Sequence, residues 1–364
     1  MTTKRLVAAL GAALCVSLGG AGVSAGGTSP ETTEPTEPAA PATPTPEWEQ
    51  IVPGGDCECA DGSEFSFWNR ASDPTKVVFF LEGGGACFSA ESCAFTNAAS
   101  YEFFVDDIPG NVAGIFDYEQ AANPLAGYSA VYVPYCTGDS HLGDATQEYA
   151  PGLTVEHNGS VNTGTAMAYL VENYPDVEEI VVVGESAGSV ATPVYAGLLA
   201  EQVPDAQITV LADGSGVYND SPELAGGIGA GLWNAQIPDF AMTDPATGTW
   251  DFLSLYDATG LSFPEIRWAR HDYAFDAVQA RFATNLGLDA SDLLALIDAN
   301  DAFIEAGGVE IDSYIAPGAD HTAVQYDSFY TETVGGVPLV DWVTALINGE
   351  DIEDVHCEDC APPQ

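Results

Sequence analysis

The sequence predicts an α/β domain built on a mostly parallel central sheet with helices on both faces. Three observations support this prediction. Four short runs are continuously apolar and rich in β-branched residues, which is typical of strands buried on both faces of a parallel sheet. Helical stretches separate these runs, and glycine-rich patches follow several of them. The predicted strands cover residues 77–81, 130–133, 180–183 and 208–211, and the main predicted helices cover residues 162–173 and 187–202.

This alternation of strands and helices favours right-handed crossovers between parallel strands. In such sheets, binding and catalytic groups gather outside the carboxyl ends of the strands. The glycine-rich patches of this chain lie at those ends, because each directly follows a predicted strand. We therefore expect the functional site at that edge of the sheet.

Two segments are predicted to precede the folded domain. Residues 1–25 begin with basic residues, continue with an apolar run and end in small residues where a signal peptidase cuts, which predicts a secretory signal peptide. Residues 26–47 are rich in Pro, Thr and Glu, which predicts a disordered linker. No internal repeat or second linker is visible in residues 48–364, so we expect one folded domain there.

The composition is strongly acidic. The chain has 55 acidic and 7 basic residues, a formal net charge of −48 at pH 7. Electrostatic repulsion makes nucleic acid and anionic membrane surfaces poor partners. No segment after the predicted signal approaches the ~20 apolar residues that a membrane span needs, so we expect no membrane insertion. We expect a monomer whose acidic surface suits saline surroundings, and no calcium-loop pattern D-x-[DN]-x-[DN]-G is present.

The cysteines predict an oxidising compartment. Of the eight cysteines, Cys15 lies in the predicted signal peptide and seven remain. Cysteines of secreted proteins usually form disulfides, and an odd number leaves at least one unpaired or paired between chains. The spacing of Cys87 and Cys93 predicts a disulfide that closes a small loop.

The cysteines near the two ends of the domain have two interpretations. In the favoured one, the cysteines form disulfides, and a pair of Cys57 or Cys59 with Cys357 or Cys360 could join the ends of the domain, although the sequence does not fix the connectivity. In the alternative, these cysteines and His356 bind zinc. Disulfides are favoured because cysteines in a secreted chain usually oxidise.

The strongest chemical signal follows the third predicted strand. The letters GESAG, residues 184–188, form a G-x-S-x-G pattern between a predicted strand and a predicted helix. In this context the pattern predicts a nucleophile elbow, a turn so tight that side chains at positions 184 and 188 would collide with neighbouring backbone. The turn presents Ser186 to both a base and a substrate, so Ser186 is the candidate nucleophile.

Three consecutive glycines, Gly83, Gly84 and Gly85, follow the first predicted strand. Glycine weakens a strand, so the run predicts that another group approaches the backbone closely here. A serine that attacks an ester carbonyl creates an oxyanion, which needs preplaced N–H donors. We therefore predict an oxyanion hole formed by the N–H groups of Gly84, Gly85 and Ala187.

Several sequence blocks occur in an order and spacing shared with a known family. These blocks are LEGGGACFSAESC, NPLAGYSAVYVPYCTGDSHLG, VVVGESAGS, VLADGSG and FDAVQ, followed by the histidine loop GADHTAV. They resemble the pectin acetylesterase/Notum family of serine carboxylesterases, and the resemblance spans residues 81–321. It implies an α/β-hydrolase fold and a catalytic triad in the chain order Ser, Asp, His.

Matched position by position, the resemblance implies Ser186 as nucleophile, Asp276 as acid and His321 as base. It also matches the three predicted oxyanion donors, and it implies no cofactor and no metal. Family members carry a bulky aromatic residue at one of the positions that match Gly85 and Ala86. Both residues are small here, so the resemblance leaves the shape of the acyl pocket open.

The residues themselves favour one histidine and leave the acid open. His321 lies in a loop of small residues after a strand-like stretch, a suitable place for a catalytic imidazole. His271 and His356 are expected to be structural or exposed. Asp213 lies at a predicted strand end, and both Asp213 and Asp272 are alternatives for the acid that orients the histidine.

Charged neighbours support Asp276 as the acid. Three arginines flank it in the sequence, and nearby positive charge favours the ionised carboxylate that the role needs. These arginines are Arg267, Arg270 and Arg281. Asp139 and His141 are expected near the mouth of the pocket, in a structural role rather than a chemical one.

These observations predict a secreted serine carboxylesterase that hydrolyses acyl esters, with acetyl groups on a polysaccharide as the expected substrate, through an acyl-enzyme intermediate. A longer-chain, lipase-like deacylase is the alternative within the same chemistry. An alternative of another class is a catalytically silent binding module displayed on the cell surface by the Pro-rich linker.

Overall fold

The computed structural model describes residues 47–96, 99–105, 113–219, 221, 224–358 and 360. The chain divides into two units, Met1–Pro44 and Thr45–Gln364. The predicted signal peptide and all of the predicted linker except its last residue lie outside the described residues. The second unit contains the helices and strands that the structure describes.

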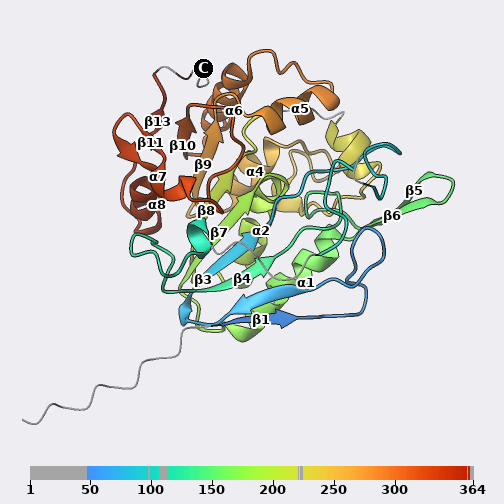
Figure 1. Cartoon of the computed structure of the whole chain (residues 1–364), viewed down its shortest axis with the longest axis horizontal. Coiled ribbons are helices and arrows are strands. Elements are labelled where there is room, and N and C mark those ends of the chain that lie inside the picture. Colours follow the sequence, from blue (N-terminus) through green and yellow to red (C-terminus); the bar gives the residue numbers. More distant parts are fainter. Residues whose placement is uncertain are drawn as a thin grey trace, which may run out of the picture. The chain divides into compact units, whose positions relative to one another are not determined.

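Within the described residues, a nine-stranded sheet forms the centre of the domain (Figure 1). The strand order is β1-β2-β4-β3-β7-β8-β9-β10-β13. All neighbours from β4 to β13 are parallel, whereas β1 and β2 form an antiparallel edge. The four predicted strands are confirmed as β3, β4, β7 and β8. The strands of the sheet are β1 (Trp48–Ile51), β2 (Phe67–Arg70), β3 (Asp73–Leu81), β4 (Tyr128–Val133), β7 (Glu179–Glu185), β8 (Gln207–Asp213), β9 (Arg267–Tyr273), β10 (Ile311–Ala316) and β13 (Val355–His356).

Helices follow most of the parallel strands, and the two predicted helices are confirmed as α1 and α2. The helices are α1 (Gly159–Asn173), α2 (Ala187–Gln202), α4 (Ser254–Ser262), α5 (Ala277–Asn285), α6 (Leu293–Gly307), α7 (Ser328–Thr331) and α8 (Leu339–Ile347). Two small antiparallel pairs lie outside the sheet: β5 (Ala145–Ala150) with β6 (Leu153–His157), and β11 (Thr333–Val334) with β12 (Val337–Pro338). Within the described part of the chain, no helix has the length and apolar character needed to cross a bilayer.

Both faces of the sheet bury apolar side chains. In β3, Val77 and Phe79 belong to one hydrophobic cluster, and Val78 and Phe80 belong to the other. Buried residues of α2 pack in the first cluster and buried residues of α8 in the second. Successive strand residues point to opposite faces, so a strand covered on both sides is apolar at every position. The mostly parallel sheet with helices on both faces is thus confirmed.

Three disulfides occur among the described residues. They are Cys59–Cys136, Cys87–Cys93 and Cys357–Cys360. The predicted small loop closed by Cys87 and Cys93 is confirmed. Cys57 is the one described cysteine outside a disulfide, and it is buried with its Sγ 3.3 Å from Oγ1 of Thr165.

The predicted disulfide between the two ends of the domain is wrong. β1 and β13 lie at opposite edges of the sheet, so the cysteines that follow them are separated by the strands between. A disulfide requires Cα atoms within about 7 Å. Cys59 instead pairs with Cys136 beyond the end of β4, where the Ala60 N–H donates to the Cys136 carbonyl at 2.8 Å.

Candidate active site

The turn between β7 and α2 has the geometry of a nucleophile elbow. Ser186 lies between the strand and the helix with φ 50° and ψ −118°, a conformation that non-glycine residues rarely adopt. A Cβ on Gly184 would lie 2.5 Å from the Gly188 carbonyl oxygen, and a Cβ on Gly188 would lie 2.1 Å from the Leu81 carbonyl oxygen. The predicted collisions at positions 184 and 188 are therefore confirmed, and they explain both glycines of the pattern.

The glycine run after β3 lies against this turn. A Cβ on Gly83 would lie 2.8 Å from the Cβ of Ser186. Gly85 has φ 79°, and a Cβ there would lie 2.1 Å from the Ser100 carbonyl oxygen. The predicted close approach is therefore confirmed. Glycine is required in this run because the elbow and a neighbouring loop both approach its backbone. Gly84, Gly85 and Ser186 line one cavity, and Gly85, Ser186 and Ala187 line a second.

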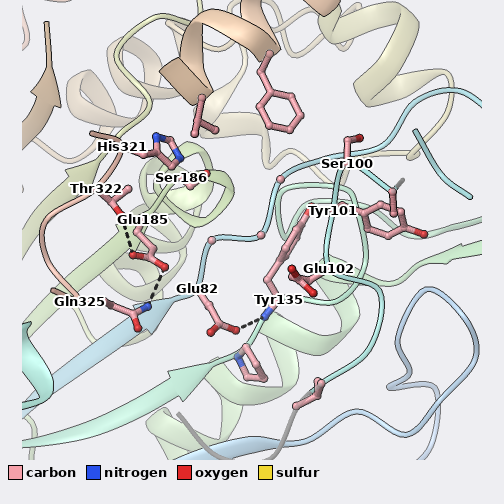
Figure 2. Close-up of a pocket in the computed structure, with 18 of the residues that line it drawn as sticks. Glu82, Ser100, Tyr101, Glu102, Tyr135, Glu185, Ser186, His321, Thr322 and Gln325 are labelled. Carbon is pink, nitrogen blue, oxygen red and sulfur yellow. Dashed lines mark hydrogen bonds between the residues drawn. The ribbon is translucent and has the colours of Figure 1, made fainter. Parts of the chain in front are cut away.

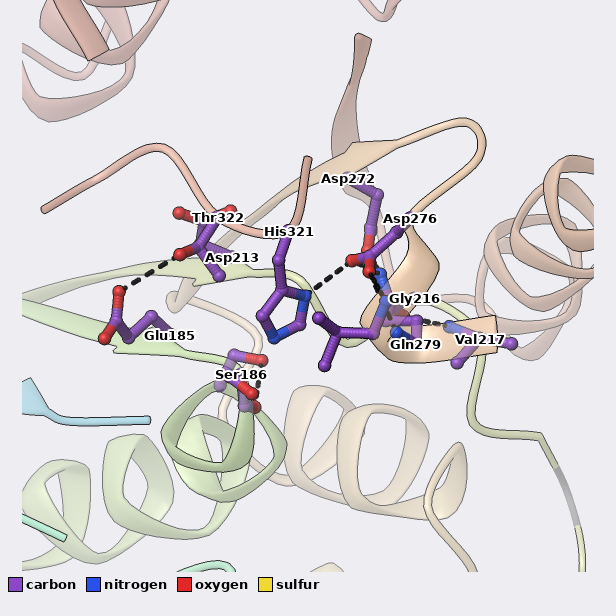
Figure 3. A network of polar contacts seen from close by, with 12 residues as sticks. Glu185, Ser186, Asp213, Gly216, Val217, Asp272, Asp276, Gln279, His321 and Thr322 are labelled. Carbon is purple, nitrogen blue, oxygen red and sulfur yellow. Dashed lines mark hydrogen bonds and ion pairs between the residues drawn. The ribbon is translucent and has the colours of Figure 1, made fainter. Parts of the chain in front are cut away.

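His321 and Asp276 form a hydrogen-bonded pair beside Ser186 (Figure 3). The distance from His321 Nδ1 to Asp276 Oδ2 is 2.6 Å. The imidazole lies between the carboxylate and the serine, and its Nε2 has no hydrogen-bond partner among the described residues. The structure thus brings the three residues Ser186, His321 and Asp276 together, although they come from the ends of three different strands.

Asp276 is completely buried and caps helix α5. Its Oδ1 accepts from the N–H groups of Val278 and Gln279, both at 2.8 Å, and its Oδ2 accepts from the Gln279 side chain at 3.0 Å. A helix N-terminus presents N–H donors and a partial positive charge, both of which stabilise a carboxylate.

The arginines near Asp276 in the sequence do not supply its contacts in the structure. Arg270 forms an ion pair with Asp301, and Arg267 donates to the backbone carbonyls of Leu346 and Glu350. The contacts of Asp276 come instead from the first turn of α5 and from His321. Sequence proximity was misleading because Arg267 and Arg270 belong to a strand whose side chains pack elsewhere. Arg281, on α5, lines the larger cavity.

The two alternative acids have other partners. Asp213 Oδ1 lies 2.7 Å from Nδ1 of His271, and both side chains are completely buried. Asp272 Oδ1 accepts from the Gly216 N–H at 2.9 Å and from the Gln279 side chain at 2.7 Å. His271 is therefore structural, one of the two possibilities expected from the sequence.

Asp139 and His141 are buried rather than at the mouth of a cavity. Asp139 accepts from Oγ1 of Thr137 at 2.7 Å and from the Gly159 N–H at 2.8 Å. His141 bonds to Oγ1 of Thr163 at 2.8 Å, and burial lowers its pKa to about 4. Their expected position was wrong, and these contacts agree with the structural role expected for both.

A large polar cavity of about 750 Å³ opens beside Ser186 and His321 (Figure 2). Glycine backbone, carboxylates, amides and aromatic rings form its walls. The polar side chains that line it include Glu82, Glu102, Glu185, Arg281 and Gln325, and the more exposed aromatic ones include Phe104 and Tyr326. A cavity of this size and polarity can hold a hydrophilic group attached to the reacting bond.

A second cavity of about 40 Å³ also borders Ser186. Its walls are mainly apolar. They include Ala86, Val190, Trp233, Phe252 and Leu286, with Ala187 next to the serine. Because the space is small and apolar, it suits a short hydrocarbon group.

Glu185 is a site residue that the sequence reasoning missed. It lines the large cavity next to Ser186, and it is only 9% exposed. Burial raises its pKa to about 8, and the neighbouring charges of Asp213 and Glu82 act in the same direction. The available signal was its place in the G-x-S-x-G pattern, where an ionisable residue directly precedes the nucleophile.

Comparisons with known proteins find relatives in sequence and in fold. The pectinacetylesterase family profile matches residues 53–230. The palmitoleoyl-protein carboxylesterase NOTUM of Schmidtea mediterranea is 30% identical over 141 residues, which cover 36% of this chain and 26% of that protein. Pectin acetylesterase 4 of Arabidopsis thaliana is 25% identical over 170 residues, covering 44% of this chain and 41% of that protein. The chain thus matches less than half the length of each of these curated relatives.

The fold has a relative among solved structures. The Wnt deacylase Notum from Drosophila superposes with a TM-score of 0.61 and 16% sequence identity, over 87% of this chain and 97% of that one. A similarity at this identity establishes the α/β-hydrolase fold. With the matched profile and the two curated relatives, it leads to one conclusion: the chain is similar to the pectin acetylesterase/Notum family in sequence and has the α/β-hydrolase fold.

Proposed function

We propose that this protein is a serine carboxylesterase whose triad is Ser186, His321 and Asp276. The observation that carries the proposal is the order of these groups in space. The buried carboxylate holds one imidazole nitrogen at 2.6 Å, and the other nitrogen faces the strained serine at the junction of two cavities. This is the arrangement that nucleophilic acyl transfer requires.

The reaction follows from these positions. Nε2 of His321 takes the proton of the Ser186 hydroxyl while the serine oxygen bonds to the ester carbonyl carbon. The N–H groups of Gly84, Gly85 and Ala187 stabilise the resulting oxyanion. His321 then protonates the leaving alcohol, and the acyl-enzyme remains. A water molecule, deprotonated by His321, attacks the acyl carbon and releases the acid.

The acyl group that fits is short. The small apolar cavity of about 40 Å³ lies beside Ser186 and Ala187, and Gly85 and Ala86 form part of its wall. It suits an acetyl group, which supports acetyl esters as the preferred substrates. A longer-chain deacylase, the activity named for the NOTUM relative, is the second candidate, because aromatic and aliphatic walls bind hydrocarbon.

The alcohol part fits the large polar cavity. Aromatic faces and carboxylate acceptors are suited to the C–H faces and hydroxyl groups of sugars. The net charge of −48 disfavours a polyanionic chain, so we propose a neutral acetylated glycan as the substrate class. The disulfides and the predicted signal peptide support a secreted location.

The test compares Ser186→Ala with the wild-type protein on 4-nitrophenyl esters of increasing chain length. We expect wild-type turnover to be highest for acetate and the variant to lose turnover on every ester. A serine-directed phosphonate should label Ser186 in the wild type only. Wild-type turnover in a folded Ser186→Ala variant would exclude the mechanism. An inactive wild type would favour the binding-module alternative, and a preference for long chains would favour the deacylase.

A further inference from the structure

Glu185 lies where the three segments of the candidate active site meet (Figure 2). It directly precedes Ser186 in the elbow. Its Oε1 accepts from the Gln325 side chain at 2.9 Å, and its Oε2 lies 3.3 Å from Oγ1 of Thr322, the residue after His321. The Gly83 N–H also bonds to the Glu185 carboxyl group. One buried side chain therefore links the nucleophile turn, the histidine loop and the glycine run.

A second carboxyl group, that of Asp213, also binds the histidine loop. Asp213 is the register partner of Glu185 at the carboxyl ends of β8 and β7. Its Oδ2 accepts from the N–H groups of Ala323 and Val324 at 2.7 and 2.8 Å, and its Oδ1 faces His271. These contacts all suit an ionised carboxylate. Two adjacent buried carboxyls thus hold four consecutive residues of the loop, starting directly after His321.

The surroundings of Glu185 disfavour a second negative charge. Asp213 faces it from β8 and Glu82 from the segment after β3. Tyr132 on β4 and Tyr326, two residues after the histidine loop, also interact with it electrostatically. Their own pKa values are raised above 10, chiefly by burial, so neither phenol loses its proton near neutral pH. Positive charge is available nearby from Arg281, which lines the same cavity, and from His271, whose bond to Asp213 raises its pKa.

We propose that Glu185 is a positioning residue that joins the histidine loop and the glycine run to the Ser186 turn in its uncharged form, and that its ionisation in mildly alkaline solution suppresses hydrolysis. The proposal rests on the esterase function proposed above. Glu185 accepts from the Thr322 hydroxyl, from the Gln325 side chain and from the Gly83 N–H. No contact with the substrate is needed for this role.

Ionisation acts on catalysis through charge. A negative Glu185 beside Ser186 opposes the oxyanion that forms when the serine attacks, and it is repelled by Asp213 and Glu82. The pKa of about 8 places this change in the mildly alkaline range. Since a raised carboxyl pKa means that the folded chain retains a proton that the unfolded chain releases, folding stability also falls as the pH rises from about 4.5 towards 8.

The experiment measures kcat between about pH 6 and pH 10 on a neutral acetyl ester. For the wild type, one ionisation near pH 8 should lower kcat about 30-fold between pH 7 and pH 9.5. Glu185→Gln mimics the uncharged acid, and its kcat should stay level over that range. Glu102→Gln removes another carboxylate of the same cavity and should keep the wild-type decline.

A second variant protects the test against misfolding of the first. Thr322 donates to ionised Glu185 and lowers its pKa, so Thr322→Val should move the alkaline decline to higher pH. An identical decline in the wild type, Glu185→Gln and Thr322→Val would overturn the proposal. Failure of the esterase function itself would appear differently, as turnover that survives Ser186→Ala at every pH.

Discussion

The domain contains two histidine–aspartate pairs with nearly identical geometry and different surroundings. His321 Nδ1 lies 2.6 Å from Asp276, and His271 Nδ1 lies 2.7 Å from Asp213. The side chain of His321 is 23% exposed and that of His271 is completely buried. The first ring faces Ser186 and a cavity, whereas Nε2 of the second is buried without a hydrogen-bond partner among the described residues.

A hydrogen bond between histidine and aspartate therefore does not by itself define a catalytic pair. A base must exchange a proton with a nucleophile, so its free nitrogen must reach one. His271 has no such access. Burial lowers the pKa of His271, but the charge of Asp213, the hydrogen bond to it and the charges of Asp272 and Glu332 together raise the pKa overall. His271 and Asp213 therefore form a buried ion pair that supports the loop carrying His321.

The difference between the catalytic and the structural pair is tested most directly by replacing the aspartate of each pair with asparagine. Asp276→Asn should lower kcat about 10⁴-fold, because the amide leaves the imidazole in the wrong tautomer. Asp213→Asn keeps one acceptor for the loop N–H groups and should lower kcat about 100-fold or less. Parallel kinetics on 4-nitrophenyl acetate would measure both. A larger loss for Asp213→Asn would reverse the assignment of the two pairs.

Stability should show the opposite order. Removing one member of a buried ion pair costs about 3–5 kcal/mol because the other charge remains buried without a partner. Asp213→Asn should therefore lower the free energy of unfolding by about 3 kcal/mol, measured by urea denaturation near pH 6, where His271 is protonated. Asp276→Asn should cost less, since its amide oxygen can still cap α5. Equal losses in the two variants would show that His271 is uncharged.

The smallest expected effect concerns the acidic surface around the His321–Asp276 pair. Ionised substrates approaching the cavity meet a net charge of −48, and salt shortens the Debye length from about 30 Å at 0.01 M to about 3 Å at 1 M. The rate on acetylated polygalacturonate should rise a few-fold more with salt than the rate on a neutral acetyl ester. A chelator in both assays prevents calcium bridging. Parallel salt curves would show that the surface charge does not act at the site.

Local sequence patterns were sufficient to predict the features that depend on neighbouring residues. The continuously apolar runs predicted the central strands, because a strand covered on both faces is apolar at every position. The G-x-S-x-G pattern predicted the strained turn at Ser186, since only glycine fits at positions 184 and 188. The glycine run predicted a close approach of backbone, which Gly83 and Gly85 confirm.

Which distant groups come into contact could not be predicted from the sequence and depends on the three-dimensional packing. Asp213, Asp272 and Asp276 all lie at or just beyond strand ends, and sequence order does not tell which of them faces His321. The disulfide expected between the two ends of the domain was wrong for the same reason, because the order of strands places β1 and β13 at opposite edges of the sheet. The buried position of Glu185 likewise depends on β8 and on the histidine loop. Such contacts are set by strand order and packing, and local sequence patterns carry little information about either.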